Sequence, residues 1–388
     1  MTDLNAARLE TLRPENIVEL AGSPAPCISI FLPAHRPGGA TQSMAAVLKM
    51  HCQEADRQLR ARELSVEEVT ELLEPLQRSI DDPELAKGSH WGRAIFRSPE
   101  LFVQMNGLES TLSGITVGGC FQLRPILAEL HFPPKFYLLT LSEKHVDLLS
   151  CSDRKAQTVE LPAGVPRSLE EALAFKPPDH DLENRSTAGS STGSMRSVRF
   201  GTTSEREKSR VYLADFFKAV DRGIREIGQA GTVPLVLAGV EEETALYRYV
   251  STYPSLAKEG IAGSPKTPFS TADLLSRAYA ILRSDLTSRT SASLKDWRER
   301  VAPERFSTDL DAILRAATEG RVGWLFINEA GRTFGTFDGT RRNGRVNWGS
   351  EDLLNVAAVE TLLQRGLVYS LPSEAMPDGI AIASVLRY

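Results

Sequence analysis

Residues 184–228 read NRSTAGSSTGSMRSVRFGTTSEREKSRVYLADFFKAVDRGIREIG, and the pattern changes within this stretch. The part through Arg210 is rich in Gly, Ser and Thr and almost lacks apolar residues, so it cannot bury enough surface to order itself and is predicted to be a loop. From residue 211 onward, apolar residues recur every three or four positions, which predicts a helix packed on a domain core. The apolar stripe comprises Leu213, Phe216, Phe217, Val220, Ile224 and Ile227.

The loop and the outer side of the helix are both basic. Lys218, Arg222 and Arg225 fall opposite the apolar stripe. Residues 185–210 carry six basic side chains against two acidic ones, a net charge of +4 in a chain whose total is −5. The six are Arg185, Arg196, Arg199, Arg206, Lys208 and Arg210. A flexible cationic arm on a rigid scaffold suits a polyanion such as RNA; a solvated linker is the alternative interpretation.

The length and composition indicate a multidomain protein of the cytoplasm. A chain of 388 residues exceeds what one hydrophobic core usually supports, so two or three domains are expected. The apolar runs are only as long as strands, and the N-terminus lacks a signal-peptide pattern, so we expect no membrane contact. The four cysteines are far apart and no histidine has metal-ligand spacing, so buried thiols are expected, with no disulfide, metal or cofactor. The cysteines are Cys27, Cys52, Cys120 and Cys151.

The chain order predicts three α/β domains. Residues 1–130 should form an N-terminal domain in which two short helices within 1–22 precede further strands and helices. These are a strand at 27–33, helices at 40–63 and 66–80, and strands at 92–97 and 101–105.

Residues 131–268 should form a central domain with the basic loop 185–210. It contains a hairpin of 136–142 and 146–151, then a strand at 233–238, a helix at 241–249 and a linker at 260–268. Gly239 alone, at the end of this strand, does not make a nucleotide-binding motif.

Residues 269–388 should form an α/β/α C-terminal domain. We expect Ser350 to cap a helix over 351–364 and Gly366 to end it. The other expected elements are helices at 271–282, 294–301 and 309–317 and strands at 322–327, 368–371 and 380–386.

No catalytic constellation stands out. The six histidines are scattered, the adjacent Asp81 and Asp82 suit a helix-ending turn, and Trp91 and Trp297 are expected in a core or interface. A second cationic cluster lies in the C-terminal domain, where a solvated face and an RNA contact are both open interpretations. It consists of Arg332, Arg341, Arg342 and Arg345. The two clusters could bracket one RNA surface.

Several short motifs, in order, resemble those of a known superfamily. They are IFLPAHRPGG at 30–39, HWGRAIF at 90–96, the hairpin at 135–149, LVLAGV at 235–240, AATEGRVGWLFI at 316–327 and GIAIASVLRY at 379–388. The chain resembles the bacterial branch of the archaeal and eukaryotic class-1 peptide release factor and Pelota superfamily. The resemblance implies a variable N-terminal domain, a Rossmann-like (RNase-H-like) central domain and a C-terminal domain like the kink-turn-binding ribosomal proteins.

The resemblance also implies a role on the ribosome. The family's release factors place Gly-Gly-Gln on the loop before the long central helix, whereas residues 190–195 here read SSTGSM, without glutamine. Gly189 and Gly193 keep backbone freedom, and Ser194 is a weak replacement for the missing amide. We therefore expect a release-factor-like protein that binds rRNA in the ribosomal A site, in rescue, stress response or hibernation, without hydrolysing peptidyl-tRNA.

A translational GTPase is a further partner that the resemblance implies, and neither DNA nor a membrane is expected. The family's codon-reading motif is not recognisable. Two alternatives stay open: a hydrolase of peptidyl-tRNA or RNA that uses Ser194 or His35, and a protein-interaction scaffold without RNA contact.

Overall fold

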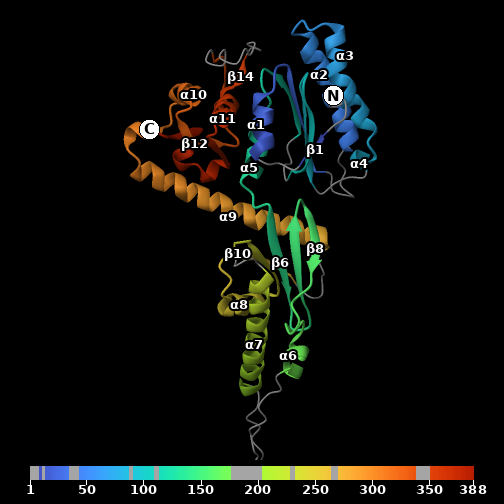
Figure 1. Cartoon of the computed structure of the whole chain (residues 1–388), viewed down its shortest axis with the longest axis vertical. Coiled ribbons are helices and arrows are strands. Elements are labelled where there is room, and N and C mark those ends of the chain that lie inside the picture. The colour runs from blue at the N-terminus through green and yellow to red at the C-terminus, as the bar shows by residue number, and fades with distance from the viewer. Residues whose placement is uncertain are drawn as a thin grey trace, which may run out of the picture. The chain divides into compact units, whose positions relative to one another are not determined.

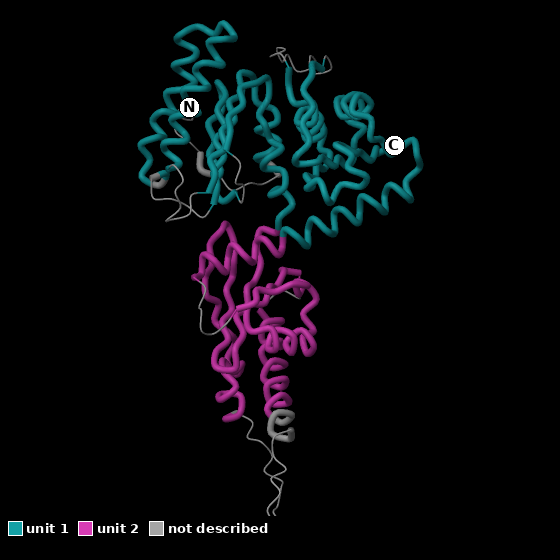
Figure 2. The backbone as a smooth tube through the Cα atoms, turned by 180° about the vertical axis from the view of Figure 1, so that it is seen from behind, with its two compact units in different colours: residues 1–132, 283–388 teal, residues 133–282 magenta. Residues whose placement is uncertain are grey.

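The computed structural model describes residues 8–10, 14–34, 43–86, 91–108, 113–175, 203–227, 232–263, 270–337 and 350–388 (Figure 1). The chain divides into two compact units (Figure 2). Unit 1 combines residues 1–132 with 283–388, and unit 2 holds residues 133–282. The mixed α/β class is confirmed, because three sheets of four or five strands are layered with helices. The three predicted domain boundaries stay a prediction.

The N-terminal part of unit 1 is a five-stranded sheet in the order β1-β4-β3-β2-β5. Its strands are β1 (Arg8–Glu10), β2 (Cys27–Leu32), β3 (Gly92–Arg97), β4 (Phe102–Leu108) and β5 (Gly114–Gly118). Side chains alternate between its faces. Ile28 and Ile30 face one core cluster, whereas Phe31 and Phe96 face another. The strand at residues 8–10 corrects the prediction of two helices in this region.

Helices cover both faces of this sheet. They are α1 (Pro14–Gly22), α2 (Met44–Arg60), α3 (Val66–Arg78), α4 (Pro83–Ala86) and α5 (Arg124–Leu130), with a 3-10 turn η1 (Ser79–Asp81). The first cluster belongs to α2 and α3, and the second to α1, α5 and the C-terminal part of the unit. Helix α3 begins with a capping box between Ser65 and Glu68, which satisfies two backbone N–H groups.

The C-terminal part of unit 1 has the predicted α/β/α layering. Its sheet order is β11-β16-β12-β15. Leu325 and Ile327 of β12 pack with α10 and α11 on one face, whereas Phe326 packs with Trp297 of α9 on the other. The elements are α9 (Thr271–Arg300, from Arg283 onward in this unit), η3 (Pro303–Arg305), β11 (Phe306–Ser307), α10 (Leu310–Thr318), β12 (Val322–Asn328), β13 (Phe334–Gly335), β14 (Glu351–Asp352), α11 (Leu353–Leu363), β15 (Leu367–Leu371), η5 (Ser373–Ala375), η6 (Pro377–Gly379) and β16 (Ile382–Leu386).

Two helix predictions in this region were wrong. Residues 271–300 form one continuous helix rather than two, because the polar stretch between the apolar segments contains neither Gly nor Pro. Helix α11 is capped by Asp352, whose side chain accepts from Leu354 N, and not by Ser350. Arg365 takes the left-handed conformation expected of Gly366. Gly366 is needed for space, because a Cβ there would lie 2.8 Å from the Val322 carbonyl oxygen.

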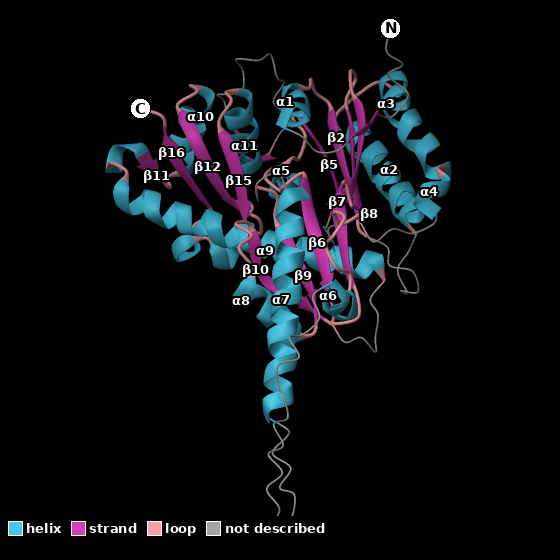
Figure 3. Cartoon of the chain, turned by 60° about the horizontal axis from the view of Figure 1, so that its bottom comes forward, coloured by secondary structure: helices cyan, strands magenta, loops and turns pink. Residues whose placement is uncertain are grey.

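Unit 2 is a five-stranded sheet in the order β10-β9-β6-β7-β8, with helices on it (Figure 3). Strands β10, β9 and β6 are parallel, and β7 and β8 follow as antiparallel strands. The elements are β6 (Lys135–Leu141), β7 (Val146–Ser152), β8 (Lys155–Val159), α6 (Leu169–Phe175), α7 (Thr203–Ile227), β9 (Leu235–Gly239), α8 (Glu241–Val250) and β10 (Leu256–Ala262). The linker predicted at 260–268 was wrong for residues 260–262, which pair with β9 as part of β10.

The four cysteines are buried and free, as predicted. In the described part of the chain, no helix combines the length and apolar character needed to cross a membrane.

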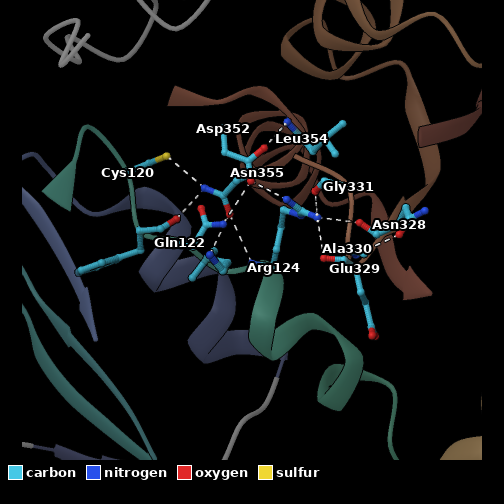
Figure 4. Close-up of polar contacts among 12 residues, drawn as sticks. Cys120, Gln122, Arg124, Asn328, Glu329, Ala330, Gly331, Asp352, Leu354 and Asn355 are labelled. Carbon is cyan, nitrogen blue, oxygen red and sulfur yellow. Dashed lines mark hydrogen bonds and ion pairs between the residues drawn. The ribbon is translucent and has the colours of Figure 1, made fainter. Parts of the chain in front are cut away.

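A buried charged hub joins the two parts of unit 1 (Figure 4). The side chains of Arg124, at the start of α5, and Asp352, before α11, are 4% and 5% exposed and form an ion pair of 2.5 Å. Arg124 Nη2 also donates to three carbonyls of the chain after β12, at Asn328, Glu329 and Gly331. The two terminal nitrogens of the guanidinium thus have partners in place of water, as a buried charge requires.

Further hydrogen bonds extend this hub along the seam, by which we mean the contact between the N-terminal and C-terminal parts of unit 1. Asn355 Oδ1 accepts from Leu123 N at 2.8 Å, and its Nδ2 donates to the Phe121 carbonyl at 2.9 Å. Four residues earlier, in β14, Glu351 Oε1 accepts from Gly119 N at 3.1 Å. Because each of these contacts spans more than 200 residues of sequence, the seam is a tertiary feature that local propensity cannot encode.

Breaking the hub should destabilise unit 1. We expect Asp352→Ala to lower its free energy of unfolding by about 3–5 kcal/mol, because Arg124 would be left as a buried unpaired charge. Urea unfolding followed by tryptophan fluorescence reports this unit, since Trp91, Trp297, Trp324 and Trp348 all fall within it.

The matched control is Arg57→Ala, which breaks an exposed pair with Glu54 on α2. It should change the same free energy by less than about 1 kcal/mol. Equal effects of the two substitutions would contradict the assigned role of the hub.

Candidate nucleic-acid interface

Helix α7 carries the basic surface that the sequence predicts. Its apolar stripe is buried as expected: Phe216, Phe217, Val220 and Ile224 are at most 1% exposed and pack against β6 and β9 in one core cluster. The helix begins at Thr203, eight residues before the predicted start, so the predicted loop was wrong for residues 203–210. Ser, Thr and Glu are common in first turns, and Glu205 and Glu207 there suit the helix dipole.

The outward side of α7 is predominantly basic. Arg210, Lys218, Arg222 and Arg225 are exposed. The last three are spaced by four and three residues, so they follow one side of the helix. Acidic side chains partly offset them: Asp215 pairs with Lys218 at 2.9 Å, and Glu226 is exposed. Arg210 and Arg222 are therefore the strongest candidates for contact with a polyanion.

A buried carboxylate clamps α7 to the chain after α8. Asp221 is 3% exposed and accepts four hydrogen bonds. The donors are the Tyr247 hydroxyl at 3.1 Å, the Ser251 hydroxyl at 2.6 Å, and the backbone N and hydroxyl of Thr252, both at 2.9 Å. A carboxylate with this many donors is stable inside the protein, because they replace its hydration shell.

The clamp reaches the basic face directly. Arg225 Nη1 donates to the same Thr252 hydroxyl at 2.8 Å, so one basic side chain is held in place by the clamp. Burial, together with the neighbouring Asp221, raises the pKa of Tyr247. Burial raises the pKa of Tyr253 to about 12, and its hydroxyl donates to the Val233 carbonyl. Both phenols thus stay protonated donors throughout the neutral pH range.

The remaining predicted site residues are placed only in part. Arg185, Gly189, Gly193, Ser194, Arg196 and Arg199 lie outside the described residues, as do His35, Arg341, Arg342 and Arg345. Arg206 and Lys208 fall in the first turns of α7, where only the backbone is described. Arg332 is exposed in unit 1. The bracketing of one RNA surface by two clusters stays a prediction.

Sequence reasoning missed the Asp221 clamp. Its signal was available, because Asp221 lies four residues after Phe217 and so falls on the apolar stripe, where a carboxylate needs buried partners. Its partners at 247–252 could not be found, because they depend on how α8 packs against α7. Within the described ranges, no group of three or more His, Cys, Asp and Glu side chains could hold a metal ion.

Removing the clamp should loosen α7. We expect Asp221→Ala to lower the free energy of opening of this helix by about 2–4 kcal/mol, because the buried hydroxyls would lose their acceptor. Amide hydrogen exchange measures that free energy locally. Asp215→Ala removes an exposed carboxylate from the same helix and should change it by less than about 0.5 kcal/mol. Equal protection in the two variants would contradict the clamp.

Comparison with solved structures finds distant likenesses. An archaeal translation termination factor, aRF1, is 12% identical, with 97% of this chain and 99% of that chain covered and a TM-score of 0.23. Pelota from Archaeoglobus fulgidus is 12% identical, with coverages of 77% and 80% and a TM-score of 0.37. Dom34 from S. cerevisiae is 9% identical, with the same coverages and a TM-score of 0.31. TM-scores this low carry no conclusion about activity or partners.

The family comparison is more specific. No curated protein matches the chain. Residues 135–321, which include all of α7, match the model of bacterial archaeo-eukaryotic release factor family 3. The resemblance predicted from the short motifs is thereby confirmed. Through this stretch the chain is similar to the bacterial branch of the archaeal and eukaryotic release factors.

Proposed function

We propose that this protein is a translation factor that binds the ribosome through the basic face of α7 and contacts rRNA in the A site, without hydrolysing peptidyl-tRNA. Its role is in ribosome rescue, stress response or hibernation. The observation that supports this most directly is the rigid mounting of the basic face. The apolar stripe and the Asp221 clamp fix the helix, and Arg210 and Arg222 point outward from it.

Electrostatics favour a nucleic-acid partner for this face. The chain as a whole has a net charge of −5, so it is not a general polyanion binder. A local cationic surface on an acidic protein binds phosphates only where the geometry brings them together. The resulting contact should weaken as salt rises, because binding releases counterions from the RNA.

The sequence supports the non-hydrolytic part of the proposal. Residues 176–202, just before α7, contain no glutamine, and the position of the family's Gly-Gly-Gln is taken by SSTGSM. A serine hydroxyl is shorter than a glutamine amide and has no carboxamide oxygen with which to orient an attacking water.

Charge reversal on α7 tests ribosome binding. We expect Arg210→Glu, Lys218→Glu and Arg222→Glu together to lower the affinity for 70S ribosomes by at least about tenfold, because each substitution removes a phosphate contact. The salt dependence of binding should fall as well, because fewer counterions are released. Co-sedimentation at two salt concentrations measures both. Arg225 is left unchanged because it bonds to the Asp221 clamp.

The control reverses three exposed arginines of unit 1, Arg57, Arg60 and Arg78, which pair with acidic residues of their own helices. It makes the same change in net charge and should leave binding intact. Wild-type protein that fails to sediment with ribosomes even at low salt would refute the proposal. Equal losses of ribosome affinity in both variants would show a nonspecific charge effect. If the α7 variant lost no affinity for a protein partner, the protein-interaction scaffold would be favoured.

Peptide release tests the absence of hydrolysis. We expect no release of peptide from ribosomes carrying peptidyl-tRNA when the purified protein is added, because no group replaces the glutamine amide. Release that is lost in Ser194→Ala would contradict this expectation and favour the hydrolase.

A further inference from the structure

An exposed phenylalanine and an exposed arginine lie two residues apart on the chain between β12 and α11. Phe334, the first residue of β13, is 64% exposed. Residue exposure alternates from 331 to 337: Arg332, Phe334 and Thr336 are exposed, and the residues between them are partly buried. Arg332 and Phe334, two residues apart, therefore both present their side chains to solvent.

Contacts with the rest of unit 1 hold the backbone of residues 331–337 in place. Arg124 of the buried hub donates to the Gly331 carbonyl at 2.5 Å, and Leu353 N donates to the Thr333 carbonyl at 2.8 Å. Gly335 lies so close to α11 that a Cβ there would be 2.9 Å from Leu353 Cδ1. Phe337 packs against the core of unit 1. The exposed ring is therefore carried by an ordered backbone.

The composition of this surface distinguishes it from a protein-docking patch. Protein interfaces are built on contiguous apolar cores. Among the residues that the structure describes, the other exposed large apolar residues of unit 1 fall on different elements: Val18, Met50 and Val66 on α1, α2 and α3, Leu367 on β15, and Tyr388 at the C-terminus. One flat ring two residues from a guanidinium instead matches one base and one phosphate, since aromatic rings stack on unpaired bases and arginine binds phosphate.

We propose that Phe334 and Arg332 form a site for an unpaired RNA base, with Phe334 stacking on the base and Arg332 binding a neighbouring phosphate. The inference rests on the proposed function. It adds to that function a contact between unit 1 and single-stranded RNA. Paired bases are excluded, because a base within a duplex already has neighbours on both of its faces.

Binding of a labelled ten-nucleotide single-stranded oligouridylate by the full chain tests the site, with a duplex RNA of equal length beside it. We expect Phe334→Ala to weaken binding of the single strand about tenfold and to leave duplex binding and the salt dependence unchanged. Arg332→Ala should weaken binding and lower the slope of log affinity against log salt by about one. Val66→Ala, at an equally exposed apolar residue, is the control and should have no effect.

Phe334→Trp supplies a local readout. It should retain affinity for the single strand, and its added tryptophan emission should be quenched by the oligonucleotide beyond any change in the four native tryptophans. Equal affinity of the Phe334→Ala variant and wild type for the single strand would overturn the inference, as would a lack of quenching at position 334.

The two proposals fail separately. Ribosome binding that depends on α7, together with an unaltered Phe334→Ala variant, would overturn only the base-stacking site. Oligonucleotide stacking at Phe334 without ribosome sedimentation would support the site and refute the proposed function.

Discussion

The ion pair between Arg124 and Asp352 is the interaction on which unit 1 depends. It is almost fully buried, and breaking such a pair leaves a charge that the interior cannot solvate. The same guanidinium holds three carbonyls of the chain after β12, and Asp352 caps α11. One side-chain pair therefore fixes the start of α11, the strand that carries Phe334, and the seam between two sheets.

Unit 2 also contains a buried charged side chain, Asp221, but its partners are of a different kind. Asp221 is a buried carboxylate without an arginine partner in its hydrogen-bond set, and hydroxyl and backbone donors satisfy it instead. Both arrangements put a buried polar group directly beneath an exposed cationic one: Asp221 beneath Arg225 through Thr252, and Arg124 beneath the strand of Arg332. The Asp221 clamp restrains the Arg225 side chain, and Arg124 holds the backbone beside Arg332. Restraint of a surface residue lowers the entropy lost when that residue binds a ligand.

The sequence predicted the periodic elements well and the long-range contacts poorly. The stripe of α7, the β6–β7 hairpin and the strand at 322–327 were predicted from the local pattern, and the structure confirms them. The start of α7 was wrong because polar residues with good helix propensity carry no apolar period. The break expected in α9 was wrong for the same reason. Asp352 and Asp221 could not be assigned, because their partners come from other elements. In the candidate interface, the exposed cations of α7 followed from spacing alone. Phe334, in unit 1, was found only from its exposure in the structure.

The division of the chain has a consequence for its synthesis. Unit 2 is encoded without interruption, between two halves of unit 1. At about 5–20 residues per second, Arg124 would wait roughly 10–45 s for Asp352 to be made. During that interval the inserted unit can complete its own core, while the apolar side of the first sheet has no C-terminal helix against it. The nascent chain can thus complete the core of its middle before its N-terminal part acquires the C-terminal elements that share its core.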